Sequence, residues 1–139
     1  MRSVEVGPSG PDDAAFILAN WKRTWRECPW AGCVRNDEIY RQVELTVEGL
    51  VLRGAEFLMA RGPGGRALGF VCHETLRDGL ACVHYLYVKD PYRGANVGAQ
   101  LVEAVPGRKP GLYTHRYRQV VEALPGPGWR HAPEVARRK

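Results

Sequence analysis

Six consecutive residues, Arg93-Gly94-Ala95-Asn96-Val97-Gly98, combine residue types that could hold a phosphate group. They follow Val83–Val88, whose aromatic and β-branched residues are typical of a strand. Apolar residues at helical spacing come next, at Val97, Leu101, Val102 and Val105. The segment therefore lies at a predicted helix start, where unpaired amide N–H groups and the helix dipole favour an anion. A strand-to-helix turn without a ligand stays open as the alternative, because short motifs also occur by chance.

This strand, turn and helix resemble the acetyl-CoA-binding motif of the GNAT superfamily of N-acetyltransferases. The family pattern is Arg or Gln, two residues, Gly, one residue, and Gly or Ala, which here falls on Arg93, Asn96 and Gly98. Asn96 replaces the first glycine, and Asn is the next best residue at a left-handed or helix-capping position. We expect the loop geometry to persist, with the Asn96 side chain crowding the pyrophosphate. The resemblance implies acetyl-CoA as acyl donor, bound by Leu86, Tyr87, Val88, Arg93, Gly94, Ala95, Asn96, Val97 and Gly98.

Three further residues could carry the proton transfers that acetylation of an amine requires. Strand alternation would place His84 on one face with the strand's aliphatic residues. Resemblance to members similar to serotonin N-acetyltransferase implies that His84 draws a proton through water, a role that suits imidazole near neutral pH. It also implies Tyr117 as the acid for the leaving thiolate, with His115 as a substitute. A purely structural pairing of His73 with His84 is left open.

The first half of the chain predicts one strand and two helices. Val4–Val6 alternates like a short strand, Gly7–Gly10 reads as a turn, and Pro11–Asp13 is a plausible helix start. Cys28–Gly32 breaks that helix, and a second helix begins near Asn36 as its cap and runs to Gly54. The predicted apolar faces are Ala14, Ile17, Leu18, Trp21 and Trp25 in the first helix, and Tyr40, Val43, Val47, Leu50 and Val51 in the second.

An antiparallel meander should lead into the motif. Glu56–Ala60 and Leu68–Thr75 are strand-like, and Asp78-Gly79 favours a type I′ hairpin. A two-residue loop there would pair residues whose numbers sum to 157, namely Thr75 with Cys82, His73 with His84, and Cys72 with Tyr85.

The end of the chain is less regular. Pro106–Pro110 reads as a linker, Gly111–Thr114 as a strand and Tyr117–Leu124 as a short helix. Trp129–Val135 could form a last strand broken by Pro133, leaving little chain for the usual closing hairpin. The expected fold is α+β: the GNAT, or acyl-CoA N-acyltransferase, fold, with a mixed, mainly antiparallel sheet and helices on both faces. We expect one domain over 1–139, with a basic tail at about 136–139, resembling minimal GNAT-like proteins of phages and prophages.

Composition favours anionic partners without naming one. The 139 residues carry a formal charge of +5 and have an isoelectric point near 9.2. We expect acetyl-CoA and an amine-bearing small molecule or protein as partners, with a homodimer left open and nucleic acid not expected. Two alternatives to an N-acetyltransferase remain: a catalytically inert GNAT-like binding protein, suggested by Asn96 and the short C-terminus, and a small basic nucleic-acid-binding domain, suggested by charge.

Other classes of site are disfavoured. The sequence has no apolar run of about 20 residues and no signal-peptide segment, so we expect a cytoplasmic protein without membrane contact. The four cysteines are then expected to be reduced. A zinc site at Cys28 and Cys33 is conceivable, but this spacing matches no common zinc pattern, and we expect no metal.

Overall fold

The computed structural model describes residues 4–93 and 96–137. These residues form two compact units. The helical unit is Gly10–Gly54, and the sheet unit combines the N-terminal segment through Ser9 with the chain from Ala55 onward. The sheet unit contains the phosphate-binding motif predicted above.

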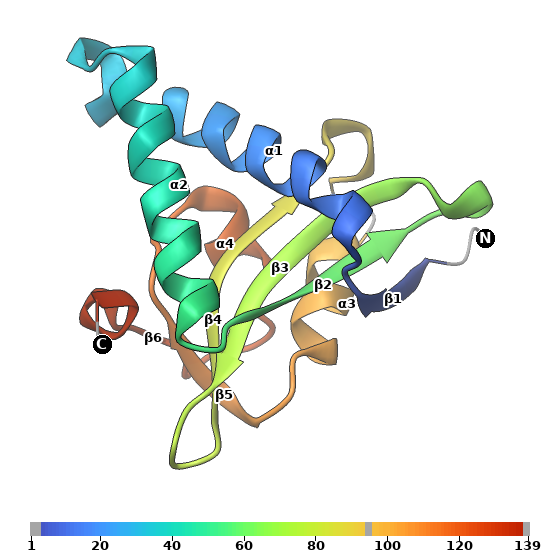
Figure 1. Ribbon diagram of the computed structural model, residues 1–139. Coiled ribbons are helices and arrows are strands. Elements are labelled where there is room, and N and C mark those ends of the chain that lie inside the picture. Colours follow the sequence, from blue (N-terminus) through green and yellow to red (C-terminus); the bar gives the residue numbers. More distant parts are fainter. Residues whose placement is uncertain (1–3, 94–95, 138–139) are drawn as a thin grey trace. The chain divides into compact units, whose positions relative to one another are not determined.

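The helical unit agrees with the predicted order of elements. It contains the short 3-10 helix η1 (Pro11–Asp13), α1 (Ala14–Arg26), the 3-10 helix η2 (Pro29–Cys33) and α2 (Asn36–Leu52), coloured blue to green in Figure 1. The Asp13 carboxylate accepts a hydrogen bond from the Gly10 amide at 2.8 Å and so fixes the first turn. Within the connection, the Arg26 guanidinium donates to the carbonyls of Ala31 and Val34 at 2.6 and 3.1 Å.

The predicted apolar face of α2 is partly wrong. The structure buries Ile39, Val43 and Leu50, whereas Tyr40 and Val51 are exposed. The buried residues recur at helical spacing on one face, and Tyr40 and Val51 each lie one position past it, about 100° further round the helix. Asn36 is the first helical residue and makes no cap, because the N-cap position belongs to Arg35.

A mixed sheet forms the other unit, as predicted. Within the described residues it has six strands in the order of the sequence, and Figure 1 shows the adjacent β2, β3 and β4 running from green to yellow. The strands are β1 (Glu5–Pro8), β2 (Glu56–Arg61), β3 (Ala67–Thr75), β4 (Leu80–Val88), β5 (Arg108–Tyr113) and β6 (Arg130–His131). Pairing is antiparallel from β1 to β4 and parallel for β4–β5 and β5–β6.

The remaining helices of this unit are short. The α-helices are α3 (Val97–Ala104) and α4 (Arg118–Ala123), and the 3-10 helices are η3 (Pro63–Gly65), η4 (Asp90–Tyr92) and η5 (Pro133–Arg137). The predicted apolar stripe of α3 is confirmed, because Val97, Leu101, Val102 and Val105 are all buried. A Cβ built at Gly98 would lie 3.0 Å from Ala123 Cβ and 3.7 Å from Leu86 Cδ2, so α3 and α4 pack together over the Leu86 side of the sheet.

Three predicted boundaries were wrong. β1 continues to Pro8, where a turn was expected, because an edge strand does not need the amide N–H that proline lacks. β5 begins at Arg108, inside the expected linker. The final strand contains only Arg130 and His131, since the chain then enters η5 at Pro133.

The β3–β4 hairpin differs from its predicted register near the turn. Leu76 and Leu80 close a three-residue loop, with the Leu76 amide donating to the Leu80 carbonyl at 2.9 Å. Thr75 therefore pairs with Ala81, and His73 with Val83. The predicted Thr75–Cys82 and His73–His84 pairs are wrong, because Gly79, at φ 85°, extends the loop by one residue.

A β-bulge at His84 then restores the predicted register. Val83 pairs with His73 and Tyr85 with Cys72, which leaves His84 as the extra residue of β4. The Cys72–Tyr85 pair is confirmed. The regular alternation of side chains between the two faces of a strand therefore does not determine the face on which the His84 side chain lies.

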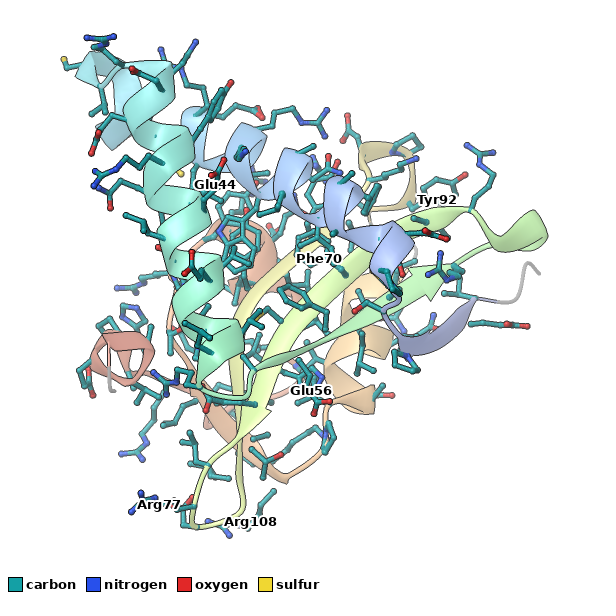
Figure 2. All side chains as sticks on the ribbon, viewed as in Figure 1. Glu44, Glu56, Phe70, Arg77, Tyr92 and Arg108 are labelled. Atoms are coloured by element: carbon teal, nitrogen blue, oxygen red, sulfur yellow. The ribbon has the colours of Figure 1, made fainter. Side chains whose placement is uncertain are left out.

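The tip of the same hairpin is held to the start of β5. Figure 2 shows Arg77 and Arg108 at this end of the sheet unit. The Arg108 guanidinium donates to the Asp78 carbonyl at 2.9 Å and lies 4.0 Å from its carboxylate. These contacts hold Arg108, the first residue of β5, next to the β3–β4 hairpin. No helix within the described residues is long and apolar enough to cross a membrane.

Candidate cofactor pocket and proton-transfer residues

The candidate site lies where β4 and β5 separate. Their last paired residues are Val83 and Tyr113, and the Thr114 amide donates to the Val83 carbonyl at 3.1 Å. β4 then continues to Val88 without a β5 partner. The bulge at His84 explains the separation, since an extra residue changes the twist of a strand and ends its regular pairing.

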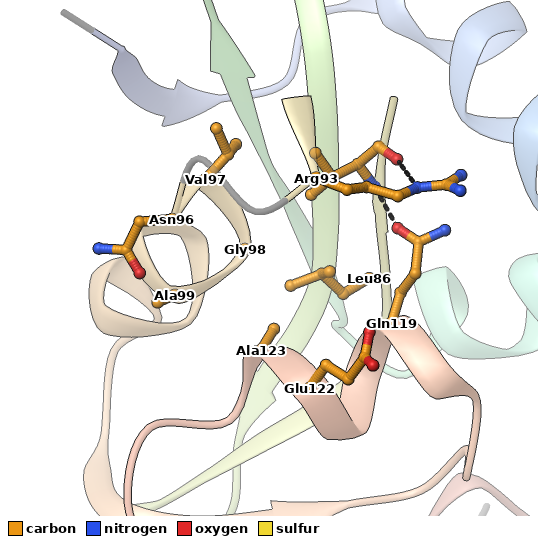
Figure 3. Close-up of a pocket in the computed structure, with 10 residues that line it drawn as sticks. Leu86, Arg93, Asn96, Val97, Gly98, Ala99, Gln119, Glu122 and Ala123 are labelled. Carbon is orange, nitrogen blue, oxygen red and sulfur yellow. Dashed lines mark hydrogen bonds between the residues drawn. The ribbon is translucent and has the colours of Figure 1, made fainter. Parts of the chain in front are cut away.

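Two side chains form hydrogen bonds with the backbone amide and carbonyl of Val88 on this open edge. The Val88 amide donates to Gln119 Oε1 at 2.7 Å, and the Val88 carbonyl accepts from Arg93 Nε at 2.8 Å. Figure 3 shows both hydrogen bonds. A buried strand edge needs such partners, because an unpaired backbone group away from water is costly.

A cavity of about 290 Å³ adjoins this edge. In Figure 3, residues of α3 and of α4 lie on different sides of the Leu86 side chain. The cavity is lined by Leu86, Val88, Arg93, Asn96, Val97, Gly98, Ala99, Gln119, Glu122 and Ala123.

The lining brings together six of the residues predicted to bind the cofactor: Leu86, Val88, Arg93, Asn96, Val97 and Gly98. Tyr87 does not line the cavity; its ring is buried 6.0 Å from that of Phe70, and the Arg93 guanidinium lies 5.7 Å from its centre. The predicted contacts of Gly94 and Ala95 lie outside the described residues.

The start of α3 has the predicted backbone shape. Asn96 adopts φ 65° and ψ 15°, in the left-handed region where Asn is tolerated better than most residues. Its side chain makes no cap hydrogen bond, whereas its carbonyl accepts from the Gln100 amide at 3.1 Å. Gly98 lines the cavity, and its lack of a side chain lets α3 pack closely on α4, because a Cβ there would lie 3.0 Å from Ala123 Cβ.

Charge in the cavity comes from one cation and one anion among the described lining residues. Arg93 Nη1 lies 3.2 Å from Asp90 Oδ1, and Arg118 Nε lies 3.2 Å from the Glu122 carboxylate. Both pairs are largely exposed, so each contributes little to stability. Their effect is local: Arg93 remains a donor close to the helix start, and Arg118 offsets the charge of Glu122.

The three predicted proton-transfer residues do not line the cavity. His84 is fully buried, and its ring contacts Thr114 Oγ1 through Nδ1 at 2.9 Å and the Glu74 carboxylate through Nε2. Thr114 Oγ1 also lies 3.0 Å from Nδ1 of the half-buried His115. Four side chains from β3, β4 and the end of β5 therefore form one hydrogen-bonded chain.

Tyr117 contacts Gln119, a residue that lines the cavity. Its hydroxyl accepts from Gln119 Nε2 at 3.3 Å, and Gln119 in turn holds the Val88 amide. The Tyr117 ring stacks on Tyr85 at 5.5 Å between centres, and His115 meets Tyr85 edge-on at 6.3 Å. Tyr117 and His115 thus share one aromatic neighbour at the point where the strands separate.

Sequence reasoning missed three residues of this site. Gln119 was assigned only to a short helix, and Glu74 and Thr114 were assigned only to strands. Their contacts with β4 join residues 10 to 31 positions apart in the chain. The available sequence signal was a polar residue in an otherwise apolar strand, because buried polar side chains usually have hydrogen-bond partners.

Burial also changes the acidity of two neighbours. The pKa of the Cys72 thiol is raised well above its ordinary value by burial, and then by the charges of Glu74 and Cys82. The pKa of His73 is lowered by burial, with Glu56 opposing and His84 adding to the change. No group of three or more His, Cys, Asp or Glu side chains within residues 4–93 and 96–137 could hold a metal ion.

Comparison with known proteins finds similarity in structure alone. No protein-family model matches the sequence, and no curated protein matches it. Among solved structures, a GNAT-family acetyltransferase from Staphylococcus aureus matches 74% of this chain and 63% of its own, with 14% identity and a TM-score of 0.52.

Two further structures contain a coenzyme. PaiA N-acetyltransferase from Thermoplasma acidophilum, in complex with coenzyme A, shares 18% identity over 73% of this chain and 68% of its own, with a TM-score of 0.55. A GNAT-family acetyltransferase from Brucella melitensis, in complex with acetyl-CoA, shares 18% identity over 73% and 65%, with a TM-score of 0.53.

The chain spans less than two thirds of the length of two of these three proteins. Identities this low establish a shared fold and leave activity open. The protein therefore has the α+β fold of the GNAT acetyltransferases.

Proposed function

We propose that this protein binds acetyl-CoA in the cavity between α3 and α4 and transfers the acetyl group directly to an amine. The observation that carries the proposal is the convergence of the sequence motif and the cavity. Arg93, Asn96, Val97 and Gly98 line a space beside an open strand edge, at a helix start.

The residues present fit such a group. The Val88 amide and carbonyl on the open edge of β4 would pair with an extended, amide-containing chain after displacement of Gln119 and Arg93, which bind them in this structure. The absence of a side chain at Gly98 permits close approach, and Arg93 supplies a cation. The first amides of α3 and its dipole favour phosphate. When bound, the thioester would supply an activated acetyl group.

The protein's own residues would then carry out two proton transfers. We assign proton removal from the amine to the hydrogen-bonded side chains that include His84. We assign protonation of the leaving thiolate to Tyr117. Tyr117 is the candidate for the second role because its hydroxyl accepts a hydrogen bond from Gln119, which lines the cavity. The acceptor is an amine-bearing small molecule or protein.

Calorimetric titration with acetyl-CoA tests the binding step. Wild type should bind, and Gly98→Glu should bind at least tenfold more weakly, since its side chain brings bulk and negative charge to the phosphate site. Gly49→Glu is the matched control, because Gly49 is an exposed helical glycine whose Cβ would meet no neighbour. Equal affinity for Gly98→Glu and Gly49→Glu would place the site elsewhere.

A second assay separates the alternatives. Release of free thiol from acetyl-CoA is measured across a panel of primary amines and basic peptides. Turnover supports the proposed enzyme, whereas tight binding without turnover on any amine supports an inert binding protein. Binding to nucleic acid that weakens steeply with salt and ignores acetyl-CoA would contradict both.

A further inference from the structure

We infer that two copies of this protein associate through one exposed face of α2, with the two helices antiparallel. This outer face of α2 consists of five exposed residues: Glu38, Arg41, Leu45, Glu48 and Leu52. The face belongs to the helical unit alone, and none of its residues lines the cofactor cavity. The inference therefore goes beyond the proposed function and does not depend on it.

Exposed apolar side chains are concentrated on α2. Among the described residues, five large hydrophobic side chains are exposed, and four of them belong to this helix. Leu45 is 50% exposed and Leu52 is 79% exposed. These two residues are seven positions apart, so they lie on nearly the same side of the helix. Apolar side chains that gather on one exposed face are typical of a surface that a partner covers.

The outer face of α2 points away from the side of the helix that packs within the protein. Val43 is fully buried, and Leu45, two positions later, lies about 160° away from it round the helix. Lys22 of α1 contacts the flank between them, because it pairs with Glu44 at 2.7 Å and lies 5.6 Å from the centre of the Tyr40 ring. Glu44 and Tyr40 thus have partners in α1, whereas the outer face is exposed to solvent.

The charges of the outer face are complementary to those of a second copy. In an antiparallel pair centred on Leu45, residues at similar distances before and after Leu45 face each other. Arg41, four positions before Leu45, then meets Glu48 of the second copy, and the two-fold axis repeats this contact on the other side. A parallel pair would instead place the two Arg41 side chains together and the two Glu48 side chains together. Charge therefore favours the antiparallel arrangement.

A second copy fits this face better than other kinds of partner. Glu38 and Glu48 would repel a nucleic acid, and two leucines make too narrow an apolar face for a membrane surface. Within one copy, Arg41 Nη1 lies 3.6 Å from Glu38 Oε1, an exposed pair that contributes little to stability. A contact limited to one helix from each copy is smaller than the roughly 1,200–2,000 Å² of a standard interface, so we expect a reversible dimer with a dissociation constant of about 10–100 µM.

Sedimentation velocity at protein concentrations from about 1 to about 500 µM tests the association. Wild type should change from monomer to dimer across this range. Leu45→Glu should weaken the dimer by at least about tenfold, because it places two like charges beside the two-fold axis. Val51→Glu is the matched control, since Val51 is also 50% exposed but lies about 120° round the helix from Leu45. Both positions are exposed, so both variants should fold, and their melting temperatures check this.

Charge reversal tests the antiparallel arrangement. Arg41→Glu and Glu48→Arg should each weaken the dimer, because each substitution brings like charges together at two symmetric places. An equimolar mixture of the two variants should form a mixed dimer, since each copy supplies the charges that the other needs. The double variant Arg41→Glu/Glu48→Arg should dimerise as wild type does. Restoration by mixing is specific to an antiparallel pair of these helices.

The opposite results would overturn the inference. Wild type that remains monomeric at about 500 µM would contradict the association, and a dimer that Leu45→Glu leaves intact would place the interface elsewhere. A mixture of Arg41→Glu and Glu48→Arg that remains monomeric would contradict the antiparallel pairing. Calorimetry should find the same affinity for acetyl-CoA in wild type and in Leu45→Glu. Loss of the dimer and failure of the proposed function are therefore separate results.

Discussion

Gln119 Oε1 lies 2.7 Å from the Val88 amide nitrogen, where a bound chain adding to the edge of β4 would place its own acceptor. Gln119 also lines the cavity and donates to Tyr117. A ligand that pairs with Val88 must therefore first displace the Gln119 side chain. In the proposed site, Gln119 would therefore compete with the ligand for the Val88 amide as well as being a structural contact.

Gln119→Ala should bind acetyl-CoA more tightly than wild type. Removing the hydrogen bond should cost about 0.5–1.5 kcal/mol of unfolding free energy and tighten binding by up to roughly tenfold. Gln119→Glu keeps an acceptor and adds a negative charge, so it should bind more weakly. Calorimetry and urea unfolding measure both quantities. Weaker binding by Gln119→Ala at unchanged stability would make Gln119 a direct ligand contact.

Asn96→Gly should bind acetyl-CoA at least as tightly as wild type. Asn96 lines the cavity and makes no cap hydrogen bond, so the substitution removes bulk from the site without removing a backbone partner. Its φ of 65° is one that glycine adopts freely. Asn96→Ala is the comparison and should be less stable than Asn96→Gly by about 1–2 kcal/mol, because its Cβ is strained in the left-handed region. Lower affinity in Asn96→Gly at an unchanged melting temperature would assign a ligand contact to the amide.

The contact between Gly98 and Ala123 should behave as a complementary pair. A Cβ at Gly98 would lie 3.0 Å from Ala123 Cβ, so Gly98→Ala forces α3 and α4 apart and should cost about 1–3 kcal/mol, less the helix-propensity gain of up to about 1 kcal/mol. Adding Ala123→Gly makes room again. The double variant should then be more stable than the sum of the two single changes predicts, by thermal unfolding. Strict additivity would show that the helices are not in contact there.

Local sequence patterns predicted the elements of the sheet unit better than its register. Asp78-Gly79 marked the hairpin correctly, but the loop is one residue longer than predicted and the bulge at His84 compensates for it. The Cys72–Tyr85 pair was therefore predicted correctly through two errors that cancel. A bulge has no simple residue signature, because it depends on what both neighbouring strands do.

The same distinction between local sequence pattern and tertiary structure applies to the candidate site. The candidate phosphate-binding turn at Arg93–Gly98 could be proposed from the sequence because its residue pattern is local. Glu74 and Thr114 could not, because only the sheet brings them to His84. His84 illustrates the difference: a role in proton transfer could be predicted for it from the sequence, whereas its partners and its isolation from solvent depend on tertiary structure.

His73 should make the protein less stable in acid. Its pKa is lowered by burial, and Glu56 and His84 are the charged groups that act on it. As pH falls below the ordinary histidine value of 6.5, the unfolded chain binds a proton that the folded chain does not, so the unfolding free energy decreases. The decrease continues until pH reaches the lowered pKa of the folded state, with a slope of at most about 1.4 kcal/mol per pH unit. Above pH 6.5 the contribution is fully present.

His73→Leu should therefore show a smaller loss of stability between pH 7 and pH 5 than wild type. The measurement is urea unfolding at half-unit steps of pH, with each free energy extrapolated to water. His131→Gln is the matched control, because it removes a histidine that is exposed in the folded state. Its pH dependence should equal that of wild type. An identical acid profile for His73→Leu and wild type would mean that His73 takes up its proton in the folded protein, with Glu56 outweighing burial.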